Sequence, residues 1–372
     1  MSVIAAGTVV LDGRVHRPGW VSVAGGRIAD CGSGQVRADT DFGDCVVVPG
    51  FVDMHCHGGA GVSYADDPDR AAALHASHGT TAGLASLVTT SREALLAQVR
   101  TLAAAVRRGV VDGIHLEGPW LSRLHCGAHD SEALRAPDDA EVDALLAAGE
   151  GTIRMVTLAP ELPGAITVIR RLVDAGIVVA VGHTDAGYEL TQEAVEAGAT
   201  VGTHLFNAMR ALHHREPGPV PALLSDPRVT VELIADGVHL HAGVIRHVVA
   251  TAGPDRVALV TDAMAAAGAG DGAFTLGGLD VDVTDGVARL HGTTTIAGST
   301  ATMGGLFGSV VRLLGGDDAA LADTARMTSS TPARTLGLHR AGVLAAGRDA
   351  DLVVLDRDWR VSRVMRRGAW LR

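Results

Sequence analysis

The sequence predicts an α/β protein, a (β/α)₈ barrel of the TIM type with a small β-sandwich formed by both ends of the chain. Eight strand-like segments between residues 45 and 262 alternate with Ala- and Leu-rich stretches. Several of these segments end in His, Asp or Glu, which fits a barrel whose active site lies at the carboxyl ends of the strands. The length of 372 residues suits one barrel of about 250 residues plus a smaller unit.

The first barrel strand is predicted to end in a His-x-His pair. An apolar run, residues 45–48, leads into His55-Cys56-His57. Because side chains alternate along a strand, we expect His55 and His57 to face one side and Cys56 to pack into the barrel wall. Two imidazoles at one strand end make half of a metal site, although such histidines also occur as plain polar edge residues.

Seven further segments continue the alternation. They are short and largely apolar, at residues 81–88, 110–116, 153–158, 177–182, 200–203, 229–235 and 257–261. Five of them lead directly into acids or histidines, namely Glu117, His183, His204, Asp236 and Asp262. The stretches between them predict helices at residues 91–108, 141–148, 166–175 and 190–197.

Both ends of the chain have a different pattern. Residues 1–48 hold short β segments at 2–11, 19–24 and 27–31, separated by Asp12-Gly13 and Gly25-Gly26 turn signals. The chain after residue 340 is again strand-like. We expect residues 1–48 and 341–372 to form one small β-sandwich beside a catalytic barrel of residues 49–340. An N-terminal hairpin and a C-terminal edge strand that never touch remain the alternative.

Composition restricts the class of protein. A net charge of −11 argues against nucleic acid and anionic membranes as partners. No uninterrupted apolar stretch of about 18 residues occurs, and the start lacks a basic region before an apolar run, so we expect a cytoplasmic protein. The four cysteines, Cys31, Cys45, Cys56 and Cys126, lack the paired spacing of a disulfide scaffold.

The chain contains no lysine, because all 31 basic residues are arginine. This excludes Schiff-base chemistry, a phosphate-loop lysine and a metal bridge made by a carbamylated lysine. Any residue that bridges two metals must therefore be a carboxylate, and Glu117 is the candidate.

The motifs together resemble one family. In chain order they read Pro-Gly-Phe-Val-Asp-x-His-x-His, His-Leu-Glu-Gly-Pro, Gly-His-Thr, Thr203-His204-Leu205-Phe206-Asn207-Ala208-Met209, Arg-Glu-Pro-Gly, Ile234-Ala235-Asp236-Gly237-Val238-His239, Val-Thr-Asp-Ala and Ala-Gly-Ser. This order resembles the N-acetylglucosamine-6-phosphate deacetylases of the amidohydrolase superfamily, over nearly the whole chain. The resemblance implies hydrolysis of N-acetylglucosamine 6-phosphate to glucosamine 6-phosphate and acetate, in amino-sugar catabolism and cell-wall recycling.

The metal set follows from chemistry and resemblance together. Glu117, His183 and His204 form a His₂Glu set that leaves a coordination position open, and the resemblance implies that they hold the family's metal. His55 and His57 make a second ion chemically reasonable, so we expect one or two divalent ions per subunit. Zinc is the expected metal, although these ligands also accept iron, cobalt and manganese.

Asp262 follows the eighth strand and is predicted to be the general base toward water and then the acid toward the leaving amine. An Asp at this position could instead only cap the next helix. Residues 120–129 are predicted to form a mobile loop over the site. Within it, Cys126 has three open roles, as a ligand, a redox-sensitive gate or an ordinary thiol, and the metal set is complete without it.

The resemblance also implies the residues that bind substrate. These are Ala128 and His129 in the loop, Asn207 and Ala208, the segment Ile296, Ala297 and Gly298, and two phosphate-binding residues, Arg215 and His239. Arginine suits phosphate because its planar fork makes paired, charge-assisted hydrogen bonds. In related enzymes this arginine reaches the neighbouring subunit's site, which implies a homodimer.

Three other functions remain to be weighed. The same chemistry on N-acetylgalactosamine 6-phosphate differs only at the sugar 4-hydroxyl, which no motif resolves. A cyclic-amide hydrolase of the dihydropyrimidinase type is disfavoured by the missing bridging lysine and by the presence of Arg215 and His239. A non-catalytic sugar-phosphate sensor is disfavoured by the intact set of metal-binding and acid–base residues.

Overall fold

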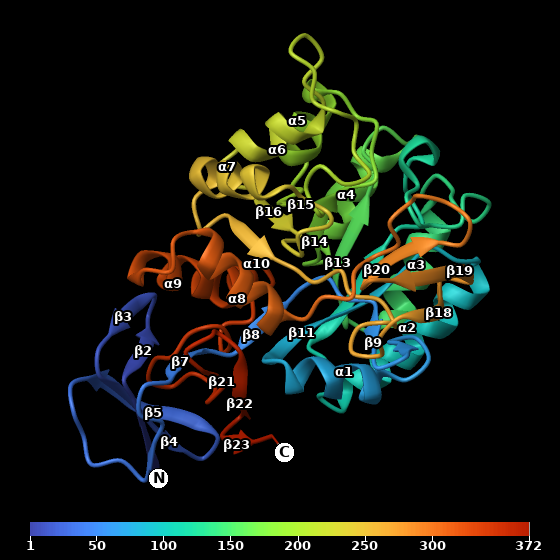
Figure 1. Cartoon of the computed structure of the whole chain (residues 1–372). Helices are drawn as coiled ribbons and strands as arrows, with labels where there is room; N and C mark the ends of the chain where they lie inside the picture. The colour runs from blue at the N-terminus through green and yellow to red at the C-terminus, as the bar shows by residue number, and fades with distance from the viewer. Residues whose placement is uncertain (372) are drawn as a thin grey trace.

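The centre of the molecule is a barrel of eight parallel strands, seen in a computed structural model that describes residues 1–371. The strands pair in chain order (Figure 1): β8 (Phe51–Asp53), β11 (Thr80–Leu87), β12 (Gly113–Glu117), β13 (Ile153–Leu158), β14 (Val178–Val181), β15 (Val201–Gly202), β16 (Thr230–Leu233) and β17 (Val257–Leu259). Each lies on a segment that the sequence predicts as a strand or, for β8, directly before the His-x-His pair. The predicted fold class is therefore confirmed.

The barrel closes beyond the ends of its first and last strands. β8 and β17 form no ladder, but the Asp262 N–H donates to the His55 carbonyl oxygen at 2.8 Å. An isolated parallel bridge joins Cys56 to Ala263 one residue further on. The seam of the barrel thus fixes His55 and Asp262 beside each other, although they are far apart in the sequence.

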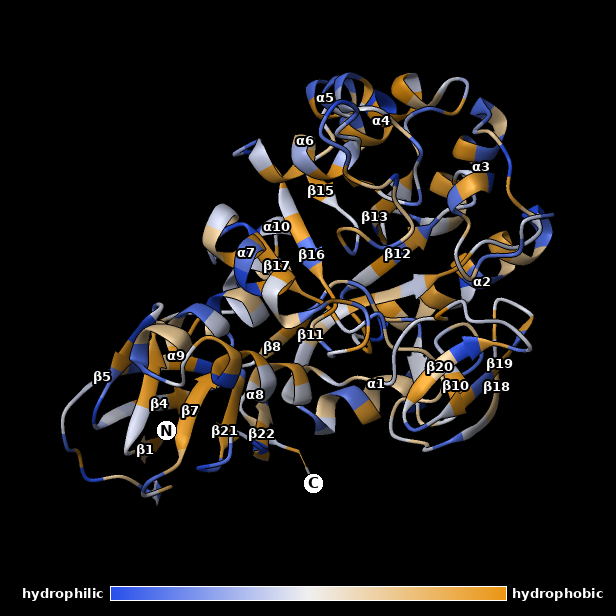
Figure 2. Cartoon of the chain, turned by 45° about the horizontal axis from the view of Figure 1, so that its top comes forward, coloured by the Kyte–Doolittle hydropathy of each residue, from blue (hydrophilic) through white to orange (hydrophobic). Residues whose placement is uncertain are grey.

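The strands are apolar on both faces because both faces are covered, as parallel sheets require. Inward residues such as Met54, Leu84 and Ala258 fill the barrel, whereas outward residues such as Ile114 and Val179 pack against the surrounding helices. Figure 2 shows this as mostly hydrophobic colouring along the central strands.

The helices cover the outside of the barrel or follow its last strand. They are α1 (Pro68–Ser77), α2 (Arg92–Arg107), α3 (Asp139–Gly149), α4 (Ala165–Asp174), α5 (Tyr188–Glu196), α6 (Pro219–Ser225), α7 (Ala242–Ala252), α8 (Met303–Leu313), α9 (Asp318–Ala325) and α10 (Thr331–Thr335). The four predicted helices are confirmed as α2 to α5. Ser91 and Asp138 cap α2 and α3 by accepting backbone N–H groups, which marks their starts.

The two ends of the chain share a β-sandwich. One sheet has the order β23-β22-β21-β7-β2-β3 and the other β5-β4-β1-β6. The strands are β1 (Ser2–Ala6), β2 (Thr8–Leu11), β3 (Arg14–His16), β4 (Gly19–Ala24), β5 (Arg27–Ser33), β6 (Thr40–Asp41), β7 (Val46–Pro49), β21 (Leu352–Leu355), β22 (Val361–Arg366) and β23 (Ala369–Trp370).

Strand β21 from the C-terminal end pairs antiparallel with β7 from the N-terminal end. Ile4 and Val21 from one sheet share a core with Val47 and Leu352 from the other. The alternative of termini that never touch is therefore wrong. The division into two domains after residues 48 and 340 stays a prediction.

One expectation about the first barrel strand needs correction. Residues 45–48 do not begin that strand, because β7 (Val46–Pro49) belongs to the sandwich and the barrel strand starts at Phe51. The chain crosses from the sandwich to the barrel at Gly50. A side chain would not fit there, because an added Cβ would lie 2.1 Å from Thr81 Oγ1. An apolar run indicates burial, but it does not indicate which sheet covers it.

A small antiparallel sheet between β17 and α8 has no counterpart in the sequence prediction. It consists of β18 (Gly272–Leu276), β19 (Leu279–Thr284) and β20 (Val287–Leu290). A separate short hairpin of β9 (Gly58–Gly59) and β10 (Val62–Ser63) follows the first barrel strand. Most residues of β18 are exposed or half-buried, so its apolar signal is weak. The sheet matters because the segment that follows it, residues 294–298, reaches the site described below. Within residues 1–371, no helix has the length and apolar character needed to cross a membrane.

Candidate active site

A cavity of about 390 Å³ opens at the carboxyl ends of the barrel strands. Its wall includes most of the predicted metal and acid–base residues, namely His57, Glu117, His183, His204 and Asp262. His55 is fully buried beneath them and contacts both carboxylates. The six side chains come from five different strands, so the barrel alone brings them together.

Glu117, His183 and His204 form one half of the cluster. Glu117 is the last residue of β12, and the two histidines directly follow β14 and β15. Glu117 Oε1 lies 3.1 Å from His183 Nε2 and 3.0 Å from His204 Nε2. The two imidazole nitrogens are themselves 3.1 Å apart. All three ligand atoms therefore point at one small volume.

His55, His57 and Asp262 form the other half. His55 Nε2 and His57 Nε2 are 3.1 Å apart, as expected for two side chains on one side of the chain. Asp262 Oδ1 lies 3.2 Å from His57 Nε2. Glu117 Oε2 lies 3.2 Å from the same nitrogen, so Glu117 faces both halves, as a bridging carboxylate would.

The hydrogen bonds around the cluster aim lone pairs into it. His55 donates from Nδ1 to Glu232 Oε2 at 3.1 Å, and His183 donates from Nδ1 to the His125 carbonyl oxygen at 2.8 Å. His55 Nε2 faces Glu117 and Asp262, and His183 Nε2 faces Glu117, so a ring that keeps its proton on Nδ1 offers the Nε2 lone pair to an ion between them. Lone pairs and carboxylate oxygens that converge in this way fit a divalent cation.

The ionisation of the cluster leads to the same conclusion. Burial alone would raise the pKa of Asp262, but the neighbouring His55 and His57 lower it below its ordinary value. Burial would lower the pKa of His57, yet hydrogen bonds to Asp262 and Glu117 raise it to about 9. The carboxylates thus attract positive charge, which a metal supplies better than protons do.

The backbone is strained where it presents these side chains. His183, His204 and Asp262 adopt positive φ angles of 47°, 25° and 48°. Residues other than glycine rarely adopt this region, and such strain persists only where surrounding contacts hold it. The three residues turn sharply out of their strands, which directs their side chains across the mouth of the barrel.

Most of the predicted substrate residues border the same cavity. Its wall includes Ala128 and His129 from the loop after β12, Asn207 and Ala208 after β15, His239, Ile296 and Gly298. Ala297 is fully buried and does not line the cavity. The loop lies over the site as predicted, but Trp120 and Leu121 at its start are buried. Its mobility stays a prediction.

His129 approaches the metal cluster more closely than the sequence indicates. Its Nε2 lies 3.2 Å from Glu117 Oε2. Its Nδ1 accepts the backbone N–H of Thr89 at 3.2 Å and contacts the Thr89 hydroxyl at 2.9 Å. Because a backbone N–H can only donate, Nδ1 is unprotonated and the proton is on Nε2. Burial lowers the pKa of His129 to about 4, so the ring is neutral.

Arg215 lies outside the cavity. It is exposed in the loop between β15 and α6, which rises at the top of Figure 1. Its guanidinium contacts His214 Nε2 at 2.7 Å, and within residues 1–371 it forms no ion pair with a carboxylate. A single subunit therefore does not bring Arg215 to its own metal cluster.

Cys126 is half-buried in the loop over the site and belongs to none of the metal-capable groups among residues 1–371. Its carbonyl oxygen accepts the His129 N–H at 3.1 Å. These contacts give no support to a role for its thiol as a ligand.

Sequence reasoning missed Glu232 and His115. Glu232 is fully buried in β16, and its Oε2 accepts hydrogen bonds from His55 Nδ1 and from the His204 N–H, both at 3.1 Å. His115 contacts Ser86 and Thr157 and stacks edge-on against His55. The sequence pattern could have identified both residues. Glu232 is a charged residue within an apolar strand, and His115 lies two residues before Glu117 in the same strand, so both side chains point to the same face.

Comparison with known proteins shows the family to which the chain belongs. The family model of the amidohydrolase family matches residues 46–371. The chain therefore belongs to the amidohydrolase family. That family uses a divalent metal, and two buried groups at the barrel mouth, His55 with His57 and Asp262, and Glu117 with His129 and His183, offer ligand atoms for it.

Similar proteins within the family carry more specific names. The chain is 40% identical over 334 residues to N-acetylglucosamine-6-phosphate deacetylase of Bos taurus, across 85% of this chain and 81% of that protein. It is 38% identical over 332 residues to N-acetylgalactosamine-6-phosphate deacetylase of Escherichia coli O157:H7, across 87% of each.

A solved structure of N-acetyl-D-glucosamine-6-phosphate deacetylase from Mycobacterium smegmatis, an Asp-to-Ala mutant in complex with N-acetyl-D-glucosamine-6-phosphate, matches with a TM-score of 0.97. It is 53% identical and covers 99% of this chain and 98% of that chain. The resemblance to this group, stated above from the motifs, is confirmed.

Proposed function

We propose that the protein is a metal-dependent deacetylase that hydrolyses N-acetylglucosamine 6-phosphate to glucosamine 6-phosphate and acetate. The observation that carries this proposal is the convergence of Glu117, His183 and His204 with His55, His57 and Asp262 at one end of the barrel. A His₂Glu set next to a further carboxylate suits metal-assisted hydrolysis of an amide.

Glu117, His183 and His204 would hold the tighter ion, and His55 and His57 would be needed only for a second. When bound, the ion would polarise the acetyl carbonyl and lower the pKa of the attacking water. Zinc is the metal that this ligand set favours. If replacing both His55 and His57 with Ala leaves two metals per subunit, the assignment of the second site is wrong.

Asp262 is the proposed proton carrier. Its pKa lies below the ordinary value because His55 and His57 outweigh the effect of burial, so the carboxylate is charged. It could accept a proton from water once a bound ion had made that water more acidic. The same oxygen can then return that proton to the nitrogen of the leaving amine, which makes the sugar product a free amine.

His129 would orient and polarise the acetyl group. The Thr89 N–H fixes its proton on Nε2, the nitrogen that faces the metal cluster. A neutral imidazole in this tautomer donates a hydrogen bond toward the carbonyl oxygen, where negative charge develops in the transition state. Ala128, Asn207, Ala208, Ile296, Ala297 and Gly298 complete the proposed sugar-binding wall.

His239 and Arg215 would bind the 6-phosphate. His239 borders the cavity and donates from Nδ1 to Asp236 at 2.8 Å, and although burial lowers the pKa of His239, this contact with Asp236 raises it overall. Arg215 would act in the neighbouring subunit of a homodimer, since its loop projects away from its own cavity. A cytoplasmic location in amino-sugar catabolism and cell-wall sugar recycling completes the proposal.

A second candidate substrate is N-acetylgalactosamine 6-phosphate, which the name of the Escherichia coli O157:H7 relative favours. The decisive experiment measures acetate release from both phosphorylated sugars, with and without a chelator. We expect release from N-acetylglucosamine 6-phosphate at the higher kcat/KM, lost with chelator and restored by metal. A higher kcat/KM for N-acetylgalactosamine 6-phosphate would make that sugar the substrate instead. If metal-loaded protein releases acetate from neither sugar, the proposed function is wrong.

A further inference from the structure

A layer of polar side chains fills the barrel directly beneath the metal cluster. Its members are buried, with exposed fractions of 3% or less, and come from β11, β12, β13 and the residue after β15: Ser86, His115, Thr157 and Thr203. The inward residues two positions earlier on three of these strands are apolar, namely Leu84, Met155 and Val201. Barrels of this type are filled mainly by such apolar side chains, so a polar layer at this height requires an explanation.

The four polar side chains form one continuous hydrogen-bonded chain. Ser86 Oγ lies 2.9 Å from His115 Nδ1, and His115 Nε2 lies 2.8 Å from Thr157 Oγ1. Thr157 Oγ1 in turn lies 2.9 Å from Thr203 Oγ1. An imidazole that carries one proton has one donor and one acceptor nitrogen, so His115 suits a hydroxyl on each side of its ring.

A glycine makes room for the last contact of this chain. Thr157 and Thr203 belong to β13 and to the end of β15, and β14 lies between these two strands. Gly182 directly follows β14, and a Cβ there would lie 2.6 Å from Thr203 Cβ and 2.9 Å from Thr157 Cγ2. The two hydroxyls therefore meet across β14 because residue 182 has no side chain.

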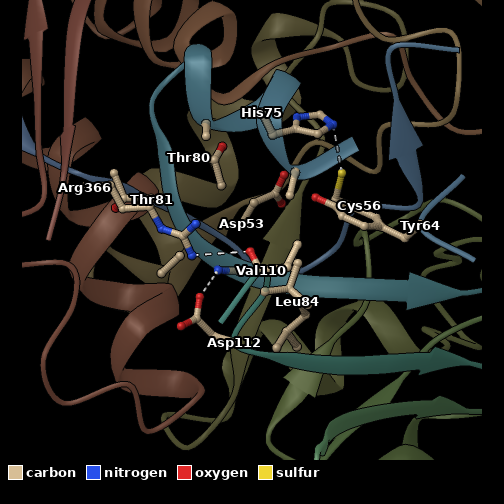
Figure 3. Close-up of a pocket in the computed structure, with 15 residues that line it drawn as sticks. Asp53, Cys56, Tyr64, His75, Thr80, Thr81, Leu84, Val110, Asp112 and Arg366 are labelled. Carbon is tan, nitrogen blue, oxygen red and sulfur yellow. Dashed lines mark hydrogen bonds between the residues drawn. The ribbon is translucent and has the colours of Figure 1, made fainter. Parts of the chain in front are cut away.

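The chain ends at backbone that carries metal ligands from both halves of the cluster. Ser86 Oγ accepts the N–H of Cys56, the residue between His55 and His57, at 3.0 Å. The Cys56 side chain points the other way, toward His75 (Figure 3), so only its backbone reaches this layer. At the other end, Thr203 directly precedes the ligand His204.

His115 lies at the centre of these connections. It is two residues before Glu117 in β12, and its ring packs edge-on against the ring of His55, with centroids 4.6 Å apart and an interplanar angle of 85°. His115 is fully buried and does not line the cavity. It therefore contacts the metal ligands and their supports rather than the space for the substrate.

We propose that His115 is a positioning residue, which holds the two halves of the metal cluster at a fixed separation through the hydroxyls of Ser86, Thr157 and Thr203. The proposal rests on the proposed function, because it assumes that the cluster binds metal. Without the His115 ring, two buried hydroxyls lose a partner, and repacking to satisfy them moves the strands that carry the ligands.

Two variants of the full-length protein test this role. His115→Phe keeps a ring against His55 but offers no hydrogen bond to either hydroxyl, and Thr203→Val keeps the shape of its side chain without the hydroxyl. We expect both to bind the tighter ion more weakly in competition with a chromophoric chelator, by about 10- to 100-fold for His115→Phe, as is common when groups that orient metal ligands are lost. Because both changes break one chain, the double variant should lose little more than His115→Phe alone.

Thr328→Val is the matched control. Thr328 is also fully buried, and its hydroxyl donates to the Thr324 carbonyl oxygen at 2.8 Å, between α9 and α10. We expect this variant to lose stability in denaturant unfolding but to keep wild-type metal affinity. The visible absorption of bound cobalt(II), which depends on ligand geometry, should shift in His115→Phe and Thr203→Val and stay unchanged in Thr328→Val.

Wild-type metal affinity in either His115→Phe or Thr203→Val overturns the proposal, and so do fully additive losses in the double variant. If His115→Phe fails to fold, Thr203→Val decides the matter, since it changes neither the size nor the shape of the side chain appreciably. A wild type that binds no metal would instead refute the proposed function itself, so the two failures are distinguishable.

Discussion

The mouth of the barrel and the terminal sandwich both bury carboxylates, but the two regions shift the pKa of the buried carboxylate in opposite directions. At the mouth, burial would raise the pKa of Glu117, yet His55 and His129 bring it well below its ordinary value. In the sandwich, burial raises the pKa of Asp351 to about 6, and the Arg367 N–H that it accepts at 2.5 Å only partly offsets this.

The two regions show that the neighbours of a buried acid, rather than its depth, decide whether it is charged. Histidines crowd the barrel mouth because eight strands end there. The edge of the sandwich offers Asp351 mainly backbone groups and the like charge of Asp349. We therefore expect substitutions at the mouth to change chemistry and those in the sandwich to change stability.

The largest effect should come from Asp262→Asn. The amide keeps the size of the side chain but cannot carry a proton, so kcat should fall roughly 10²–10⁴-fold with metal still bound. Steady-state kinetics and metal analysis on the same preparation measure this. Asp351→Asn is the matched control and should keep near-normal turnover. Wild-type kcat in Asp262→Asn, in protein free of contaminating enzyme, would remove Asp262 from its role.

The next prediction, Arg215→Ala, compares this arginine with Arg340, which lies next to the sandwich. Arg340 forms an ion pair with Asp349, whereas Arg215, in the loop after β15, forms none within residues 1–371. If Arg215 binds phosphate, its loss should cost about 1.5–3 kcal/mol, or roughly 10- to 150-fold in kcat/KM for the phosphorylated sugar.

The same substitution should scarcely affect unphosphorylated N-acetylglucosamine, which offers the guanidinium no charge. Arg340→Ala is the control and should change neither value. An equal loss on both sugars would mean that Arg215 supports the dimer or the fold. A wild type without preference for the phosphorylated sugar would contradict the substrate class.

Glu232→Gln tests whether Glu232, which is buried beneath the metal cluster, supports metal binding by orienting His55. Glu232 receives the His55 Nδ1–H and the His204 N–H, so it orients ligands on both halves of the cluster. Changes to such supporting groups commonly weaken metal binding about 10- to 100-fold. Competition with a chromophoric chelator should show this. Unchanged metal affinity would limit Glu232 to a packing role.

The smallest effect should be the pH dependence that Asp351 gives to stability. Its folded pKa of about 6 exceeds the ordinary value of 3.8, so the folded protein binds more protons between those values. Stability should therefore decline as pH rises from about 4 to 6, by about 1–3 kcal/mol, and level off above that. Denaturant unfolding across this range should show a flatter profile for Asp351→Asn. An identical slope in both proteins would contradict the assignment.

The sequence by itself determined the barrel and most of its site. Apolar strand segments alternate with helices, and parallel strands end on one face, so His183, His204 and Asp262 had to meet. The period of two along a chain placed His55 and His57 together and turned Cys56 away, as the structure confirms.

Only the tertiary structure decided which distant groups became partners. Glu232 lies 177 residues from His55 in the chain, and no local pattern connects the two. The sequence predicted a sandwich of both chain ends, but it did not mark that residues 46–49 would pair with β21. Cys56 met His75 because α1 packs behind the barrel seam. Periodicity is local and can be read along the chain, whereas pairing across the fold depends on the packing of the whole molecule.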